Sequence, residues 1–131
     1  MKKMNKIRRR LEKKIFDEAI DIIESYTDNR QEKYIYLKSK NWHPGVIGVV
    51  SSRLSIKYGV PVILVAISNG VGKASCRSSN GVNVFNIFAD IKDNFIRFGG
   101  HDLAAGFVAK VENLEIPNIN FFYKHVESSF K

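Results

Sequence analysis

The chain contains a continuous apolar run, Val62-Ile63-Leu64-Val65-Ala66-Ile67, which is followed at once by the turn signal Ser68-Asn69-Gly70. A strand without polar positions is typical of a sheet that is covered on both faces. An Asn-Gly pair between two strand-like runs favours a tight hairpin. Residues 71–77 are therefore expected to return as an antiparallel strand.

Upstream of this hairpin, the apolar residues of segment 45–58 follow helical spacing, and Gly59 and Pro61 predict the end of that helix. The β-type run Tyr34-Ile35-Tyr36-Leu37 predicts a strand that ends near residue 39. The first 26 residues predict one long helix, because apolar positions recur along it every three or four residues without Gly or Pro.

Downstream of the hairpin, Asn83 can cap a helix that runs to about residue 93. Residues 98–101 contain two glycines and are expected to form a loop. A strand over 105–111 and a last helix over 117–130 complete the prediction.

These elements predict a compact α/β domain with a mixed β-sheet flanked by helices, preceded by a long N-terminal connecting helix. We expect residues 1–30 to form the connecting helix and residues 31–131 to form the domain. Because most helices owe their stability to packing against another surface, we expect this long helix to dock on another element.

Composition and charge narrow the function. The 131 residues suit one domain, and no apolar run is long enough for a transmembrane helix. The single Cys76 cannot form an internal disulfide, which favours a cytoplasmic protein. The net charge is +8, and residues 33–110 alone carry ten basic and three acidic side chains. Such a bias favours anionic partners, nucleic acid among them.

The segment Trp42-His43-Pro44-Gly45 opens the predicted helix over 45–58. A helix N-terminus offers free N–H groups and a favourable dipole end to an anion. His43 and Arg53 are therefore candidate substrate contacts. The alternative is that Gly45 and Gly48 serve tight packing of the helix on the sheet.

The predicted strand over 71–77 carries candidate anion contacts. Strand alternation places Lys73, Ser75 and Arg77 on one face, with Ser78 just beyond. An arginine can grip a phosphate through two N–H groups. The alternative is an exposed strand face that is merely polar.

Gly99 and Gly100 precede His101 in the expected loop over 98–101. Consecutive glycines can expose backbone N–H groups to an anion, and the histidine can donate to a phosphate oxygen or move a proton. The alternative is a histidine with a structural role.

The sequence lacks a clustered set of metal ligands, a phosphate-binding loop of the Walker type and a dinucleotide-binding fingerprint. Cys76 has no evident base partner and is expected to be a packed, inert cysteine. The residues therefore indicate an anion-binding module without its own catalytic centre, and we expect no cofactor in this chain and no catalysis by the chain alone.

Three ordered motifs resemble those of the bacterial RecJ exonucleases. They are the segment that begins at Trp42, the strand that contains Arg77 and Ser78, and Gly-Gly-His-Asp-Leu-Ala-Ala-Gly-Phe over 99–107. The resemblance implies binding of single-stranded DNA by Arg77, Ser78, Gly99, Gly100 and His101. It also implies that an Asp-His-His phosphoesterase domain of the same protein holds Mn²⁺ or Mg²⁺. Cys76 departs from the family, in which a glycine usually stands at this position.

The sequence thus predicts a substrate-binding domain of a RecJ-like 5′→3′ exonuclease in DNA repair and recombination, with Lys73, His43 and Arg53 as further contacts. One alternative is the corresponding domain of an oligoribonuclease or nucleotide phosphatase. Another is a non-enzymatic RNA-binding module.

Overall fold

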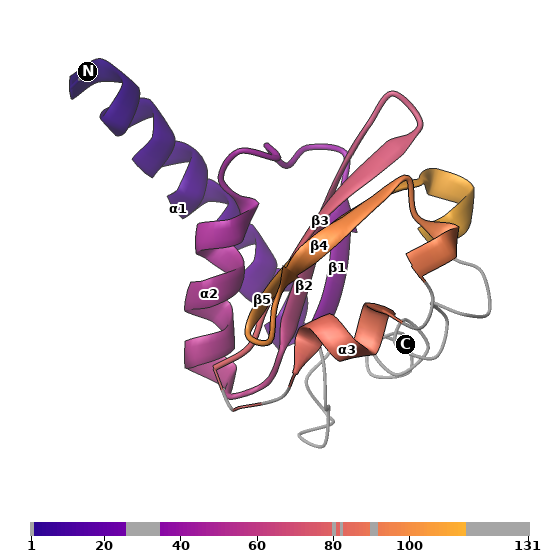
Figure 1. Ribbon diagram of the computed structural model, residues 1–131. Coiled ribbons are helices and arrows are strands. Elements are labelled where there is room, and N and C mark those ends of the chain that lie inside the picture. The colour runs from indigo at the N-terminus through magenta and orange to yellow at the C-terminus, as the bar shows by residue number, and fades with distance from the viewer. Residues whose placement is uncertain (1, 26–34, 80, 82, 90–91, 115–131) are drawn as a thin grey trace.

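The computed structural model describes residues 2–25, 35–79, 81, 83–89 and 92–114. These residues form helices and strands around one sheet (Figure 1). The helices are α1 (Lys2–Ser25), α2 (Ile47–Tyr58) and α3 (Val84–Ala89), with short 3₁₀ helices η1 (Lys92–Asn94) and η2 (Val111–Leu114). The strands are β1 (Ile35–Ser39), β2 (Val62–Ser68), β3 (Val71–Arg77), β4 (Arg97–His101) and β5 (Ala104–Lys110).

The sheet has the strand order β1-β2-β3-β5-β4. β1 and β2 are parallel, and the other neighbouring pairs are antiparallel. The parallel pair requires a crossover, which α2 supplies. The predicted hairpin between β2 and β3 turns at Asn69 (φ 53°) and Gly70 (φ 77°), both in the left-handed region that such a turn needs. The predicted α/β class with a mixed sheet is confirmed.

Helices cover both faces of β2, as its apolar run predicts. On one face, Val62 and Leu64 pack with α1 and α2. On the other face, Ile63 and Val65 pack with α3 and η2. All four side chains are fully buried. The successive side chains of a strand alternate between the two faces of its sheet. The central strand therefore joins two apolar layers into one domain.

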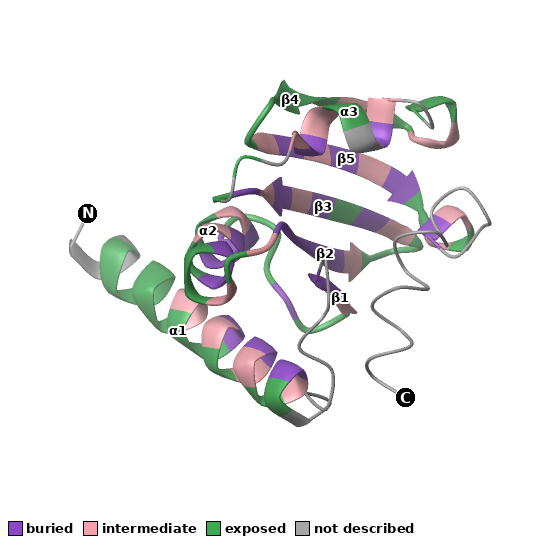
Figure 2. Cartoon of the chain, turned by 90° about the horizontal axis from the view of Figure 1, so that it is seen from below, coloured by how far each residue is buried: buried purple, intermediate pink, exposed green. Residues whose placement is uncertain are grey.

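The C-terminal half of α1 packs on this domain. Ile15, Ala19 and Ile23 are buried against the layer that contains α2. Trp42 Nε1 donates a hydrogen bond of 2.6 Å to Glu18. The N-terminal half of the helix projects beyond the sheet, where residues 5–10 are exposed (Figures 1 and 2). The long helix is expected to dock on another element, and its C-terminal half does so within its own chain.

A second hydrogen bond, 2.8 Å from Tyr58 Oη to Glu24, joins the end of α2 to α1. Burial raises the pKa of the Tyr58 phenol above its ordinary value, and the Glu24 carboxylate raises it further. Tyr58 therefore keeps its proton and its hydrogen bond across the ordinary pH range.

Two predicted elements differ in the structure. Of the helix expected over 83–93, the described residues form α3 and, at Lys92 and Asp93, part of the 3₁₀ helix η1. Asn83 caps α3 by accepting a hydrogen bond of 2.9 Å from Asn86 N. The expected loop over 98–101 is wrong, because these residues belong to β4. The chain turns back after η1, and Ile96 N donates to Val108 O at 2.7 Å, which starts the pairing of β4 with β5.

The last helix predicted over 117–130 lies outside the described residues. In the part of the chain that the structure describes, no helix is both long and apolar enough to cross a membrane.

Candidate functional site

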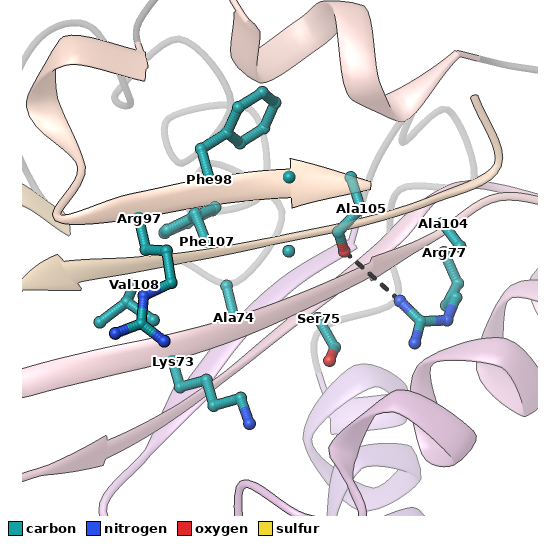
Figure 3. A pocket seen from close by; sticks show the side chains of 12 residues that line it. Lys73, Ala74, Ser75, Arg77, Arg97, Phe98, Ala104, Ala105, Phe107 and Val108 are labelled. Atoms are coloured by element: carbon teal, nitrogen blue, oxygen red, sulfur yellow. Dashed lines mark hydrogen bonds between the residues drawn. The ribbon is translucent and has the colours of Figure 1, made fainter. Parts of the chain in front are cut away.

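A groove of about 440 Å³ lies over β3, β5 and β4 (Figure 3). Burial alternates along β3 and β5, so that every second side chain turns away from the core (Figure 2). The described residues that line the groove are Lys73, Ala74, Ser75, Arg77, Arg97, Phe98, Gly99, Ala104, Ala105, Gly106, Phe107 and Val108.

The strand register arranges the outward-facing residues in three rows across the sheet. Each row takes one residue from β4, one from β5 and one from β3. The rows are Arg97–Val108–Lys73, Gly99–Gly106–Ser75 and His101–Ala104–Arg77. The predicted placement of Lys73, Ser75 and Arg77 on one strand face is thus confirmed, and a row of small residues separates the two ends of the groove.

Arg77 lies where α2 meets the sheet. Its Nη1 donates hydrogen bonds to Cys76 O at 2.9 Å and to Ala105 O at 3.4 Å, the second of which is drawn in Figure 3. A Cβ on Gly48 would stand 2.8 Å from Nη2 of Arg77 and 3.5 Å from Oγ of Ser75. The missing side chain at position 48 therefore makes room for the guanidinium.

The first turn of α2 adds positive potential beside Arg77. Its N-cap, Val46, makes no side-chain capping hydrogen bond, and Gly48 lies within this first turn. The N-terminus of a helix carries the positive end of the helix dipole. A negatively charged group beside Arg77 would be attracted by both the guanidinium and the helix.

The groove is cationic. Lys73, Arg77 and Arg97 contribute positive charges, and none of the described residues that line it is acidic. Ser75 adds a hydroxyl, and Gly99 leaves open space, since a Cβ there would meet no atom within 4 Å. The arrangement suits an elongated polyanion whose backbone can approach the sheet closely.

Three of the predicted site residues, Lys73, Arg77 and Gly99, come together in this groove. His101 is exposed and belongs to the row of Arg77, but it lies at the outer end of that row and does not line the groove. Gly100 (φ 133°) could not carry a side chain, because a Cβ would collide with Ala104 O and Ala105 Cα. Both glycines belong to β4, so they form part of a strand and not a loop of exposed N–H groups.

The remaining predicted residues lie outside the groove. Ser78 is buried, and its N–H donates to Leu103 O at 2.9 Å. His43 is exposed and shapes the loop before α2, since its Nδ1 accepts a hydrogen bond of 2.9 Å from Gly45 N. Arg53 is exposed on α2. The contribution of these three residues to binding stays a prediction.

Sequence reasoning missed Arg97, which lines the groove opposite Lys73. The signal was present in the alternation of Arg97, Gly99 and His101, which share one face once residues 97–101 form a strand. Reading the two glycines as a loop concealed that alternation.

Within the described ranges, the groove has neither a reactive cysteine nor a cluster of metal ligands. Cys76 is fully buried, and burial raises the pKa of its thiol although the charge of Arg77 opposes this. The interpretation as a packed cysteine is confirmed. The described residues hold no group of three or more His, Cys, Asp or Glu side chains that could bind a metal ion together.

Residues 31–127 match the DHHA1 domain family. The chain is 34% identical to the single-stranded-DNA-specific exonuclease RecJ of Bacillus subtilis (strain 168) over 113 residues, which cover 85% of this chain and 14% of the relative. The crystal structure of RecJ in complex with Mg²⁺ from Thermus thermophilus superposes with a TM-score of 0.73 at 31% identity and covers 98% of this chain and 18% of that chain.

The C-Ala domain of alanyl-tRNA synthetase from Aquifex aeolicus has a TM-score of 0.51 at 12% identity, over 74% of this chain and 87% of that chain. At this identity the likeness concerns the fold alone. The chain spans 14% of the Bacillus subtilis relative and 18% of the Thermus thermophilus chain, less than a fifth of each.

Proposed function

Because the chain belongs to the DHHA1 domain family, we propose that it is the nucleic-acid-binding domain of a single-stranded-DNA exonuclease. In this proposal the groove over β3, β5 and β4 holds the phosphates of one DNA strand. The observation that carries it is the cationic groove around Arg77, which contains no described acidic residue. The similarity to RecJ proteins named as specific for single-stranded DNA supports the choice of ligand.

The chemistry of the groove suits the phosphates of an extended strand. Each phosphodiester carries one negative charge and presents two oxygens to the guanidinium fork of Arg77. Ser75 Oγ can donate a further hydrogen bond. The row Gly99–Gly106–Ser75 has only small side chains, so a sugar–phosphate chain can lie close to the sheet there. His101 extends the row of Arg77 toward the outer edge of the sheet, where it could contact the same strand.

Hydrolysis is assigned in this proposal to another part of the protein. The residues described here do not fit a metal ion, so no catalytic step is derived through one. We propose that an Asp-His-His domain supplies the Mn²⁺ or Mg²⁺ site, and that the DHHA1 domain closes over that site and holds the DNA. We also propose a cytoplasmic role in DNA repair and recombination.

Binding of single-stranded oligothymidylate by the chain is expected to weaken steeply as salt rises. Each phosphate that a cation neutralises contributes a slope of about −0.7 in log K against log salt. Fluorescence anisotropy between low and physiological salt measures this slope. A slope near zero would refute an electrostatic groove.

The basic half of α1 requires a control in this measurement, because its exposed arginines can also bind DNA. The triple variant Arg8→Gln, Arg9→Gln and Arg10→Gln removes three exposed charges that lie outside the groove. The proposal expects the variant to keep most of the affinity. If the variant no longer binds DNA, the site lies on α1 instead.

A Gly48→Ala variant is expected to bind single-stranded DNA about threefold to tenfold more weakly, because its methyl group displaces one end of the Arg77 guanidinium. Thermal stability should not fall, since alanine favours a helix by about 1 kcal/mol over glycine. Paired anisotropy and thermal unfolding separate the two effects. Unchanged affinity in the folded variant would show that the position of the Arg77 guanidinium beside α2 is unimportant for binding.

A further inference from the structure

We propose that Lys73 and Arg97 form a second phosphate contact, at the opposite end of the groove from Arg77, so that the groove takes phosphates two nucleotides apart on one strand. The inference rests on the proposed function and adds to it a length requirement for the ligand. Arg97 was not among the residues that the sequence motifs indicated.

Lys73 and Arg97 lie on either side of Val108 in the sheet. Val108 of β5 pairs with Lys73 of β3 on one side and with Arg97 of β4 on the other. All three therefore face the groove, and Figure 3 shows the lysine and arginine side chains extending to the same side of the sheet. With neighbouring strands about 5 Å apart, their two long side chains can converge on one anion over Val108.

This pair of cations is distinct from Arg77. Lys73 and Arg77 are four residues apart on β3, which at a rise of about 3.3 Å per residue separates their Cα atoms by about 13 Å. The guanidinium of Arg77 is held near its own end of β3 by Cys76 O and Ala105 O, so the two cationic positions are separate. The groove therefore offers two cationic positions with an uncharged row between them.

The spacing matches a nucleic acid chain. A nucleotide repeat contains six backbone bonds, and so do two residues of a polypeptide. One extended nucleotide therefore spans about as much as two residues of a β-strand, and the four-residue step from Lys73 to Arg77 corresponds to two nucleotides. The phosphate between them would lie over Gly99, Gly106 and Ser75, where the Ser75 hydroxyl can donate and Gly99 leaves open space.

Both cations are available for this contact. Lys73 and Arg97 are exposed, and within the described ranges neither makes an ion pair. No described acidic residue lines the groove to compete with a phosphate. A cationic pair that no protein group neutralises is suited to an external anion.

The test compares 5′-phosphorylated mono-, di- and trithymidylate, which carry one, two and three phosphates, by calorimetry or NMR titration of the whole chain at low salt. Only the trinucleotide can place phosphates at both ends of the groove. We expect the step from di- to trinucleotide to increase affinity about tenfold. The Lys73→Gln/Arg97→Gln variant should lose this step and keep the affinity for the mononucleotide.

The matched control is Lys57→Gln/Lys92→Gln, which removes two exposed charges that do not line the groove and should preserve the step. If the wild-type chain gains nothing from the third nucleotide, or if Lys73→Gln/Arg97→Gln keeps the gain, the second contact is refuted while the site at Arg77 stands. If none of the three ligands binds the wild-type chain, the proposed function fails and this inference fails with it.

Discussion

Replacing Arg77 with alanine is expected to weaken the binding of single-stranded DNA by about tenfold to a hundredfold without unfolding the domain. A charge-assisted hydrogen bond contributes about 1.5–3 kcal/mol, which corresponds to this range. The guanidinium is half-exposed and donates to the backbone carbonyls of Cys76 and Ala105, both on strands that are paired without it. Anisotropy with oligothymidylate and thermal unfolding measure the two quantities separately.

Two further variants make this result specific. Arg77→Lys keeps the charge but not the planar fork, so it should recover only part of the lost affinity. Lys57→Ala removes an exposed charge of α2 outside the groove and should have little effect. If Arg77→Ala and Lys57→Ala reduce binding equally, the chain attracts DNA through its net charge alone and the groove is not the site.

A Gly100→Val variant is expected to be destabilised by about 3 kcal/mol or more, because valine is strained at positive φ and collides with backbone atoms. The Cβ would overlap Ala104 O and Ala105 Cα of the adjacent strand, which cannot move without breaking the pairing of β4 and β5. Thermal unfolding followed by circular dichroism should show a Tm lowered by about 10 °C or more.

The neighbouring glycine provides the control. A Cβ on Gly99 meets no atom within 4 Å, and Gly99 lines the groove, so Gly99→Val should fold normally and bind DNA more weakly. Equal stability of the Gly100→Val and wild-type chains would contradict the described geometry of β4. Normal DNA binding by Gly99→Val would show that the ligand does not approach the middle row of the groove.

Local sequence signals were sufficient for the centre of the fold. The apolar run in β2 forms a strand buried on both faces, and the Asn69-Gly70 turn joins it to β3. Gly59 ends α2 in the left-handed conformation, and its N–H donates to Ser55 O. Period-two alternation then places Lys73 and Arg77 on one face, so half of the candidate site follows from a short stretch of chain.

The other half depends on a tertiary contact that local signals oppose. Two adjacent glycines favour a loop, yet residues 97–101 form an edge strand because β5 offers them a paired partner with small residues opposite. Only this pairing brings Arg97 and Gly99 beside Val108 and Gly106. The groove could not be located from sequence because its second wall comes from that strand.

Mapping amide chemical shifts of the isotope-labelled chain during a titration with single-stranded oligothymidylate tests the central claim most directly. We predict that the resonances that shift cluster on Lys73, Ser75, Arg77, Gly99 and Gly106 and on the first turn of α2. Shifts confined to the exposed residues 5–10 of α1, or spread over the surface without a cluster on the groove, would contradict the assignment of the open face of β3, β5 and β4 as the DNA-binding site.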